Sequence, residues 1–373
     1  MREGPVRIMS FRLGAAALVP MAGLLTPTAV IAEDAAAECS PSGQYAFICG
    51  LRNPEDLVVV PGTEWIISSG MAPDGAIYLV DAKRRAWSEL YPGDAPRARH
   101  DTESYGACPG APAPEGFVTH GLNIRAGADG HSTLYVVSHG AREAIEVFDV
   151  DATGDAPVLT WRGCVLTPDR MEANSVASLP DGSLLVTIPL HTGVPISDAM
   201  AGKPTGGVYR WSPGDPAFTM VQGTDLPYAN GIEASADGRE FYVVSSGLLN
   251  VTAYSNGNPA QLLRRTETFA FVPDNLHMTG DGRLLTAGLN VVDEACGDVR
   301  QAAEFRLEEF ASCPRPFTVL AIDPSSMQGE IVATGPANAH FSNITMALPV
   351  GDELWIGTFA GDRIASTALG SAD

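Results

Sequence analysis

The sequence has 373 residues and a formal net charge of −21 at pH 7, with 44 acidic residues against 23 basic ones. Such an excess of negative charge excludes nucleic acid as a natural partner, because binding to a phosphate backbone depends on lysine and arginine. The chain contains 39 glycines, 28 prolines and many short runs of valine, isoleucine, leucine and tyrosine, but no long helical period beyond its N-terminus. This composition favours one large all-β domain over two smaller domains.

The first 32 residues are typical of a secretion signal. Three arginines, the last of them Arg12, precede an apolar run that extends to Ile31 and ends at Ala32. A membrane anchor is the alternative, but two prolines and many small residues within the run argue against a stable membrane span. The absence of a cysteine close behind the run argues against lipid attachment. We therefore expect an exported protein, periplasmic or extracellular, whose mature domain covers residues 33–373.

The cysteines are six in number, and an even number in an exported chain indicates disulfides. Their spacing matches no zinc-binding motif. Several pairings are open from the sequence, and we favour those between neighbours along the chain: Cys39 with Cys49, Cys108 with Cys164, and Cys296 with Cys313.

A short motif recurs along the whole chain. It consists of a polar residue, a β-type run, a turn and a second β-type run, as in residues 174–187 and 230–244. The turn is an Asp-Gly pair in most copies, and a third β-type run often follows, as in residues 75–81. Six copies are present, and they start at Glu55, His120, Asn174, Asn230, Asn275 and Asn343.

Six copies of such a unit predict a six-bladed β-propeller, because each unit can supply the antiparallel strands of one blade. A β-sandwich with a similar number of strands is the alternative, but a sandwich does not require the same polar start and turn in every unit. The units are longer than bare strands and tight turns require, so we also expect sizeable loops between the strands.

The polar residues that start the units are candidates for a metal site. The first strand of each blade lies nearest the propeller axis, so these residues should meet at one mouth of the central channel. For any single asparagine, turn formation is the simpler explanation, and the prediction of a central metal-binding channel depends on the recurrence. Hard oxygen ligands of this kind suit Ca²⁺ better than zinc or copper. Four blades would supply them: Glu55, Asn174, Asn230, Asp274 and Asn275.

Two histidines of the second unit should lie at the same mouth. His120 begins the first strand of this unit and His139 ends the second, and antiparallel pairing places both at one end of the sheet. His120 is therefore a candidate general base acting on a water molecule, with His139 orienting it, although a structural role is the alternative for either histidine alone. The other histidines are interpreted as loop or core residues: His100, His131, His277, His191 and His340. Of these, His191 and His340 are also candidate pocket walls.

In combination, these motifs resemble the paraoxonase/arylesterase family, within the wider group of gluconolactonase-like and strictosidine-synthase-like six-bladed β-propellers. The resemblance runs from about residue 50 to residue 360 and is carried by Pro54-Glu55-Asp56 with Ile67-Ser-Ser-Gly70, His120-Gly121 with His139, Ala173-Asn174, Ala229-Asn230-Gly-Ile232, and Asp274-Asn275. It implies a calcium-dependent hydrolase of lactones, with side activity on aryl esters or phosphotriesters. It also implies that the five oxygen-bearing residues hold the catalytic ion and that the two histidines form the family's dyad.

The resemblance implies a second, structural Ca²⁺ as well. The family holds it with the acidic residue after the first glutamate, here Asp56, and with an acidic residue after the third-blade asparagine. Ser175 occupies the latter position, which leaves Asp56 and a backbone carbonyl near Leu122 for this second site. The family's ring-closing disulfide to the C-terminus is missing, because no cysteine follows Cys313.

The expected function is thus hydrolysis of a small lactone or ester, in which the ion polarises the carbonyl group and His120 activates water. The sequence shows no serine-nucleophile elbow, no P-loop and no dinucleotide-binding turn. Two alternatives stay open, a non-catalytic propeller with structural calcium that binds a ligand or partner, and a metal-free strictosidine-synthase-like enzyme. We expect the loops at residues 91–117, 191–205 and 290–316 to set the substrate.

Overall fold

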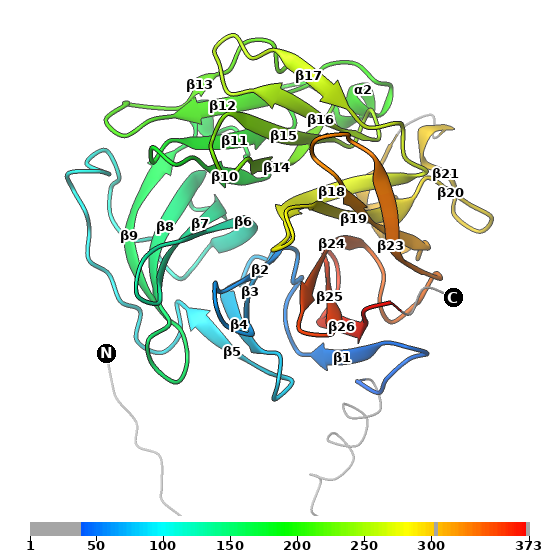
Figure 1. The fold of residues 1–373 in the computed structure, drawn as a ribbon, viewed down its shortest axis with the longest axis horizontal. Coiled ribbons are helices and arrows are strands. Elements are labelled where there is room, and N and C mark those ends of the chain that lie inside the picture. Colours follow the sequence, from blue (N-terminus) through cyan, green and yellow to red (C-terminus); the bar gives the residue numbers. More distant parts are fainter. Residues whose placement is uncertain (1–38, 302–304, 371–373) are drawn as a thin grey trace, which may run out of the picture. The chain divides into compact units, whose positions relative to one another are not determined.

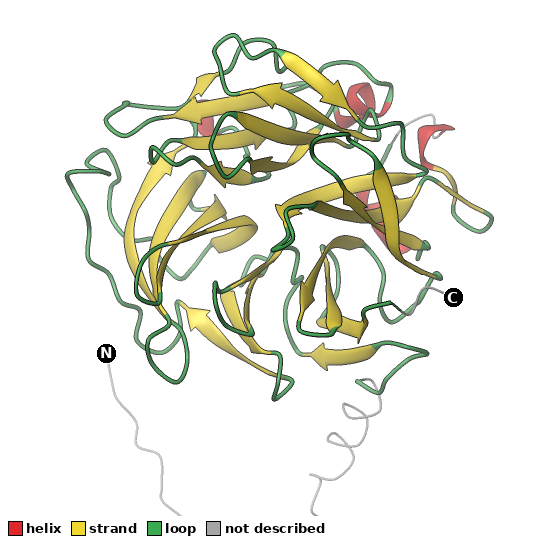
Figure 2. Ribbon diagram, in the orientation of Figure 1, coloured by secondary structure: helices red, strands yellow, loops and turns green. Residues whose placement is uncertain are grey.

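Six four-stranded antiparallel sheets follow one another around a central axis in the computed structural model, which describes residues 39–301 and 305–370 (Figures 1 and 2). All of these strands belong to the unit Pro41–Asp373, and a separate N-terminal unit ends at Ser40. This arrangement confirms the predicted six-bladed β-propeller. The predicted signal segment, residues 1–32, lies outside the described residues. No helix in the described ranges is long and apolar enough to cross a membrane.

The first three blades are built from consecutive strands, each sheet running outward from the axis. Blade 1 contains β2 (Leu57–Val59), β3 (Trp65–Ser69), β4 (Ile77–Asp81) and β5 (Ala86–Tyr91). Blade 2 contains β6 (Phe117–Ala126), β7 (His131–Gly140), β8 (Ala144–Asp151) and β9 (Val158–Leu166). Blade 3 contains β10 (Val176–Ser178), β11 (Leu184–Ile188), β12 (Gly207–Trp211) and β13 (Thr219–Met220).

The last three blades follow the same plan, with one insertion and one exchange. Blade 4 contains β14 (Ala229–Ala234), β15 (Glu240–Ser245), β16 (Asn250–Ser255) and β17 (Leu262–Arg265). Blade 5 contains β18 (Phe271–Met278), β19 (Leu284–Asn290), β22 (Phe317–Ile322) and β23 (Gly329–Gly335). Blade 6 contains β24 (Ile344–Val350), β25 (Glu353–Thr358), β26 (Arg363–Ala368) and, outermost, β1 (Ala46–Cys49).

Short elements occupy the connections between strands. They are η1 (Pro168–Arg170), α2 (Ile196–Met200), the hairpin β20 (Val292–Asp293) and β21 (Gly297–Asp298), η2 (Val299–Gln301) and α3 (Leu307–Ser312). The helical ones lie in loops outside the sheets (Figure 2). The last four fill the long connection between β19 and β22, so the expectation of sizeable loops holds here.

The ring is closed by the N-terminal strand. β1 pairs antiparallel with β26, with Ala46 opposite Ser366 and Cys49 opposite Arg363. The sequence motif had indicated only three strands for the sixth unit, and the fourth comes from the opposite end of the chain (Figure 1). The ring is therefore closed by backbone hydrogen bonds between β1 and β26. In the family that the motifs resemble, a disulfide to the C-terminus closes the ring.

Apolar residues pack between neighbouring blades, and this explains why the middle strands are hydrophobic throughout. In β3, Ile66 packs toward blade 6 and Ile67 toward blade 2, and both are fully buried. In β11, Leu184 and Leu185 likewise belong to different interfaces. A strand covered on both faces needs a continuous apolar run instead of an alternating one. Each burial of a leucine or isoleucine side chain contributes about 1.5–3 kcal/mol, so the blades hold one another in place.

The Asp-Gly turns and two of the disulfides occur where the sequence placed them. Gly182 has φ +84, a conformation that favours glycine, and Asp181 accepts a hydrogen bond from the Ser183 amide at 2.9 Å. The pairings Cys108–Cys164 and Cys296–Cys313 are confirmed. Cys39 and Cys49 are also disulfide-bonded, and such bonding is typical of an oxidising compartment.

Candidate functional site

The inner strands carry the candidate site residues, and several of these strands are bulged at the residue concerned. The register of β6 with β7 shifts between Thr119 and Leu122, where His120 lies, and that of β18 with β19 shifts between Pro273 and Leu276. β14 shifts in the same way around Asn230. A bulge redirects a side chain out of the regular alternation of a strand. The sequence had placed these residues at or just ahead of the starts of their strands, and in these three blades they lie within the strands.

A close approach of neighbouring blades explains the glycine after His120. A Cβ atom on Gly121 would lie 2.4 Å from the carbonyl oxygen of Asn174, a distance that backbone atoms do not allow. The Gly121 amide donates a hydrogen bond to the same oxygen at 3.2 Å. The His-Gly motif thus brings the second and third blades together at the axis.

One pocket of about 290 Å³, at one end of the inner strands, is lined by most of the predicted residues. Its floor is polar and its walls are apolar. Six predicted residues line the floor: Glu55, His120, His139, Asn174, Asn230 and Asp274. Asn275 is fully buried beside them and donates a hydrogen bond from Nδ2 to Glu55 Oε1 at 2.6 Å.

Four oxygen atoms of the predicted metal ligands are buried without a hydrogen-bond partner. They are Glu55 Oε2, Asn174 Oδ1, Asn230 Oδ1 and Asn275 Oδ1. The amide nitrogen of Asn230 donates to Ser246 Oγ at 3.0 Å, and this contact fixes the orientation of its side chain. Burying a polar atom without a partner costs about 1–3 kcal/mol, so four such atoms from four blades fit a cation or a hydrogen-bond donor as their partner.

The two carboxylates of the floor, Glu55 and Asp274, both have raised pKa values. Burial raises the pKa of Glu55 well above its usual range, and the charges of Asp56 and Asp274 add to the effect. Burial also raises the pKa of Asp274 to about 7. No cluster of three or more histidine, cysteine, aspartate or glutamate residues suited to a metal occurs in the described part of the chain. The predicted ligand set instead combines two carboxylates with three amides.

The histidine pair extends into a chain of three side chains. His120 Nδ1 lies 3.0 Å from His139 Nε2, and His139 Nδ1 lies 2.6 Å from Glu143 Oε2. On the other side, His120 Nε2 lies 3.8 Å from Glu55 Oε2. Burial lowers the pKa of His120 to about 3, and the neighbouring His139 adds to the effect, so His120 is the neutral imidazole. The sequence missed Glu143, whose position in the turn after β7 was the available signal.

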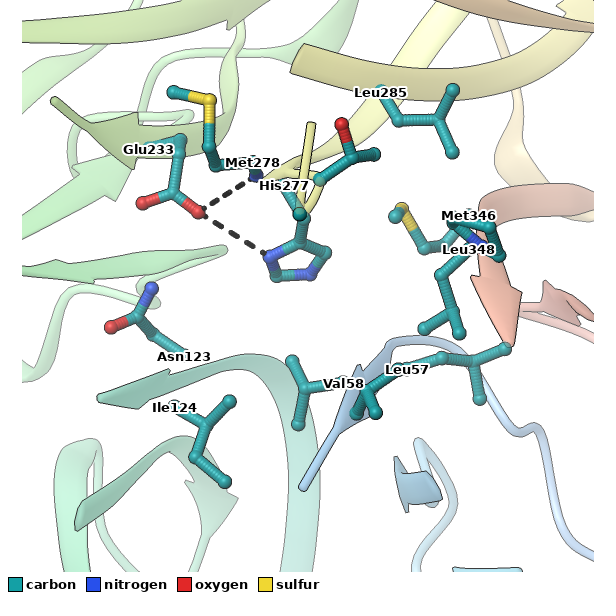
Figure 3. A pocket seen from close by; sticks show the side chains of 14 residues that line it. Leu57, Val58, Asn123, Ile124, Glu233, His277, Met278, Leu285, Met346 and Leu348 are labelled. Carbon is teal, nitrogen blue, oxygen red and sulfur yellow. Dashed lines mark hydrogen bonds and ion pairs between the residues drawn. The ribbon is translucent and has the colours of Figure 1, made fainter. Parts of the chain in front are cut away.

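A second pocket, of about 180 Å³, lies at the other end of the inner strands (Figure 3). His277 points into it, and His277 Nε2 lies 2.7 Å from Asp56 Oδ1. Glu233 Oε2 is 3.8 Å from His277 Nδ1. Burial alone would lower the pKa of His277, but the two carboxylates outweigh it and raise the pKa to about 10. His277 is therefore a largely buried cation within β18, and its interpretation from the sequence as a loop or core residue did not include this charge.

Asp56 belongs to this second pocket's network. It is fully buried, and it accepts hydrogen bonds from the backbone amides of Leu57 at 2.8 Å and Leu122 at 2.7 Å. Leu122 thus offers Asp56 its N–H group, where the resemblance had implied a carbonyl ligand. Ser175, the residue after Asn174, is buried, and its hydroxyl oxygen has no hydrogen-bond partner. A second ion at Asp56 stays a prediction and would have to compete with these contacts.

Two of the three loops expected to set the substrate reach the main pocket. α2 contributes Ile196 and Met200, and the connection after β19 contributes several apolar side chains. Residues 91–117 instead follow the outer edge of blade 2, where the Arg99 amide donates to the Trp161 carbonyl at 2.8 Å. Neither His191 nor His340 lines the pocket, since His191 contacts the Tyr209 hydroxyl at 3.2 Å and His340 is exposed.

Comparison with sequence families gives one match over most of the chain. Residues 69–313 match the family described as "SMP-30/Gluconolactonase/LRE-like region". The matched range contains every predicted site residue except the Glu55-Asp56 pair. A search of curated proteins found none that matches the chain.

Solved structures with the same fold share little sequence with the chain. A luciferin-regenerating enzyme is 14% identical with a TM-score of 0.52, covering 87% of this chain and 94% of that one. A gluconolactonase from Xanthomonas campestris is 15% identical with a TM-score of 0.51, covering 87% and 89%. A calcium-binding regucalcin from Agrobacterium tumefaciens is 11% identical with a TM-score of 0.50, covering 86% and 91%. At these identities the likeness establishes the fold alone.

Proposed function

Because the chain belongs to the SMP-30/gluconolactonase/LRE-like family, we propose that it is a calcium-dependent hydrolase of lactones and aryl esters. The finer assignment follows the paraoxonase/arylesterase family that its motifs resemble. One observation carries the proposal: four oxygen atoms are buried without partners, and three of them belong to residues that line the same pocket as the hydrogen-bonded histidine pair.

The donor set fits Ca²⁺. This ion takes about six to eight oxygen ligands in flexible geometry, and the floor offers carboxylate and amide oxygens together with room for water or substrate. Glu55 and Asp274 would balance the charge of the ion, and Asn174, Asn230 and Asn275 would complete the protein's share of the ligands. When bound, the ion supplies a Lewis acid that polarises the substrate carbonyl and stabilises the oxyanion.

The histidines supply the base. A carboxylate only accepts hydrogen bonds, so Glu143 requires the proton of His139 to be on Nδ1. His139 Nε2 then accepts from His120 Nδ1, which leaves a lone pair on His120 Nε2. This atom faces Glu55 in the pocket and would take a proton from the attacking water. The water oxygen adds to the carbonyl carbon, and the proton passes to the alkoxide or phenoxide that leaves.

The test is hydrolysis of lactones and esters by the full chain, measured before and after removal of divalent ions. We expect turnover of dihydrocoumarin, δ-valerolactone or phenyl acetate that a chelator abolishes and Ca²⁺ restores. An oxyanion-stabilising contact contributes about 3–4 kcal/mol, so the ion-free protein should lose more than about a hundredfold in rate.

A matched pair of variants separates the site from the fold. Asn230→Ala should lose activity, while Asn123→Ala removes a buried amide in the second pocket and should keep it. Hydrolysis that ignores the chelator would contradict the calcium mechanism. A rise in melting temperature with Ca²⁺ but no hydrolysis of any lactone or ester would instead support a non-catalytic binding propeller.

We further propose that the protein acts outside the cytoplasm on a small-molecule substrate. The disulfide-bonded cysteines support an oxidising compartment, in agreement with the signal segment expected at residues 1–32. The experiment is fractionation of the cells that produce it, with N-terminal sequencing of the mature chain; a product that retains its first residues in the cytoplasm would contradict this proposal.

A further inference from the structure

Three charged side chains meet at the second pocket, and each comes from a different blade. We call Asp56, Glu233 and His277 the channel triad. Asp56 directly precedes β2 of blade 1. Glu233 belongs to β14 of blade 4 and His277 to β18 of blade 5 (Figure 3). The pocket is also lined by residues of β6 and β24, so the inner strands of five blades surround it.

The His277 ring lies between the two carboxylates of the triad. Its Nε2 is 2.7 Å from Asp56 Oδ1 and its Nδ1 is 3.8 Å from Glu233 Oε2. A carboxylate accepts hydrogen bonds and donates none, so the proton of the shorter contact is on Nε2. Only 12% of the His277 and Glu233 side chains is exposed, and Asp56 is fully buried. Buried carboxylates require a compensating positive charge, and the ring supplies it.

Backbone amides fix both carboxylates around the ring. Glu233 Oε1 accepts from the Ala234 amide at 2.8 Å, and Glu233 Oε2 accepts from the Met278 amide at 3.1 Å. On the other side of the ring, Asp56 Oδ2 accepts from the Leu122 amide of β6 at 2.7 Å. The triad therefore joins blades 1, 2, 4 and 5 across the channel.

The residues at Asp56 do not fit the second, structural Ca²⁺ that the motif resemblance implies. A carboxylate offers about four lone pairs, and three hydrogen-bond donors already use those of Asp56. They are the His277 ring and the Leu57 amide on Oδ1, and the Leu122 amide on Oδ2. Ser175, at the position of the family's second acidic ligand, offers only a neutral hydroxyl. Ca²⁺ takes about six to eight oxygen ligands, carboxylates among them, and this set falls short of that.

We propose that the channel triad replaces the second Ca²⁺, with His277 as the cation at its centre, so that the inner strands are held together by the chain's own side chains and no ion binds at Asp56. The inference concerns a different site from the catalytic ion of the proposed function, and the two have separate tests.

The first test counts the Ca²⁺ ions bound to the full chain, by equilibrium dialysis and metal analysis at a free Ca²⁺ that saturates the main pocket. Wild-type protein should bind one ion, and Asn230→Ala should lose it. Two bound ions would overturn the inference. A single ion that Asn230→Ala leaves unchanged and Asp56→Asn removes would also overturn it, because that ion would lie in the second pocket.

Two further variants test whether His277 keeps the ion out. Ser175→Asp supplies the missing carboxylate but leaves the ring on Asp56, so the count should stay at that of the wild type. Adding His277→Ala frees Asp56 Oδ1, and the double variant should bind one ion more, with a second rise in melting temperature on addition of Ca²⁺. Ser88→Asp, at an exposed serine of β5, is the matched control and should leave the count unchanged.

The outcomes keep this inference apart from the proposed function. An additional ion in Ser175→Asp alone overturns the role of His277, and so does a folded double variant that gains no ion. If the double variant does not fold, the counts of the wild type and of Ser175→Asp decide. A wild-type count of zero overturns the proposed calcium mechanism and agrees with the channel triad, and the double variant should then bind one ion.

Discussion

Replacing Glu143 by glutamine tests the histidine chain most directly. The variant keeps the size of the side chain but replaces an obligate hydrogen-bond acceptor by an amide that can also donate. If the amide donates to His139 Nδ1, the proton of His139 moves to Nε2 and is donated to His120 Nδ1. His120 then carries its own proton on Nε2, toward the pocket, and cannot accept one from water.

The size of the effect follows from the contact. The Glu143 side chain is 9% exposed and its oxygen lies 2.6 Å from His139, the geometry of a charge-assisted hydrogen bond. Such bonds contribute about 1.5–3 kcal/mol. With a factor of ten for each 1.4 kcal/mol or so, kcat should fall about 10- to 150-fold. KM should change little, because Glu143 does not line the pocket.

The assay is the initial rate of lactone hydrolysis at saturating Ca²⁺, with kcat and KM separated. Glu330→Gln, on an exposed glutamate of β23, controls for the loss of one negative charge. Calcium affinity, read from melting curves, should be the same in both variants and the wild type. A Glu143→Gln variant with wild-type kcat would refute the assignment of His120 as a base oriented through His139.

Three further predictions concern the ion and the second pocket. Asn230→Ala should weaken Ca²⁺ binding at least about tenfold in a titration followed by melting, with Asn123→Ala unchanged; equal affinities would exclude Asn230 as a ligand. The pKa of Asp274 is raised from its ordinary value of 3.8 to about 7. The ion-free protein should therefore lose stability as the pH rises from 3.8 through 7, and the stabilisation by added Ca²⁺ should grow over that range. A calcium-induced shift in Tm that is independent of pH would contradict this. His277→Gln should lower the free energy of unfolding by about 3 kcal/mol, because it leaves Asp56 buried without its cation. The stabilisation by protonated His277 is complete below pH 6.5 and disappears as the pH rises through 10. Urea unfolding at high pH should therefore give the same free energy of unfolding for the wild type and the variant.

The six blades were predictable because each unit forms the same antiparallel sheet and carries the same local sequence pattern. A polar start, an apolar run and an Asp-Gly turn recur locally, and no knowledge of distant contacts is needed to recognise them. The gathering of Glu55, Asn174, Asn230 and Asp274 in one pocket followed from this repeat, since equivalent positions of equivalent strands must surround one axis. Their role as calcium ligands stays a prediction until it is measured.

The features that were missed depend on partners far away in sequence. The bulge at His120 is a property of its pairing with β7, and pairing registers are not visible in one strand. His277 was interpreted as a loop or core residue because the charges that hold it, Asp56 and Glu233, come from other blades. A signal was nevertheless present, because alternate residues of a strand share a face and His277 stands two positions after Asn275. β1 gave no signal, since the motif does not occur in its four residues.

The closure of the ring by β1 also sets the order in which the domain can be completed. β1 is among the first parts of the domain to be synthesised and its partner β26 among the last. Until Arg363 and the residues after it are available, blade 6 lacks its third and fourth strands and blade 1 has no complete neighbour on that side. A fragment that ends earlier has six inner strands but no closed circle to hold them at a common centre. Closure of the ring therefore depends on the pairing of β1 with β26, which joins two segments far apart in the sequence.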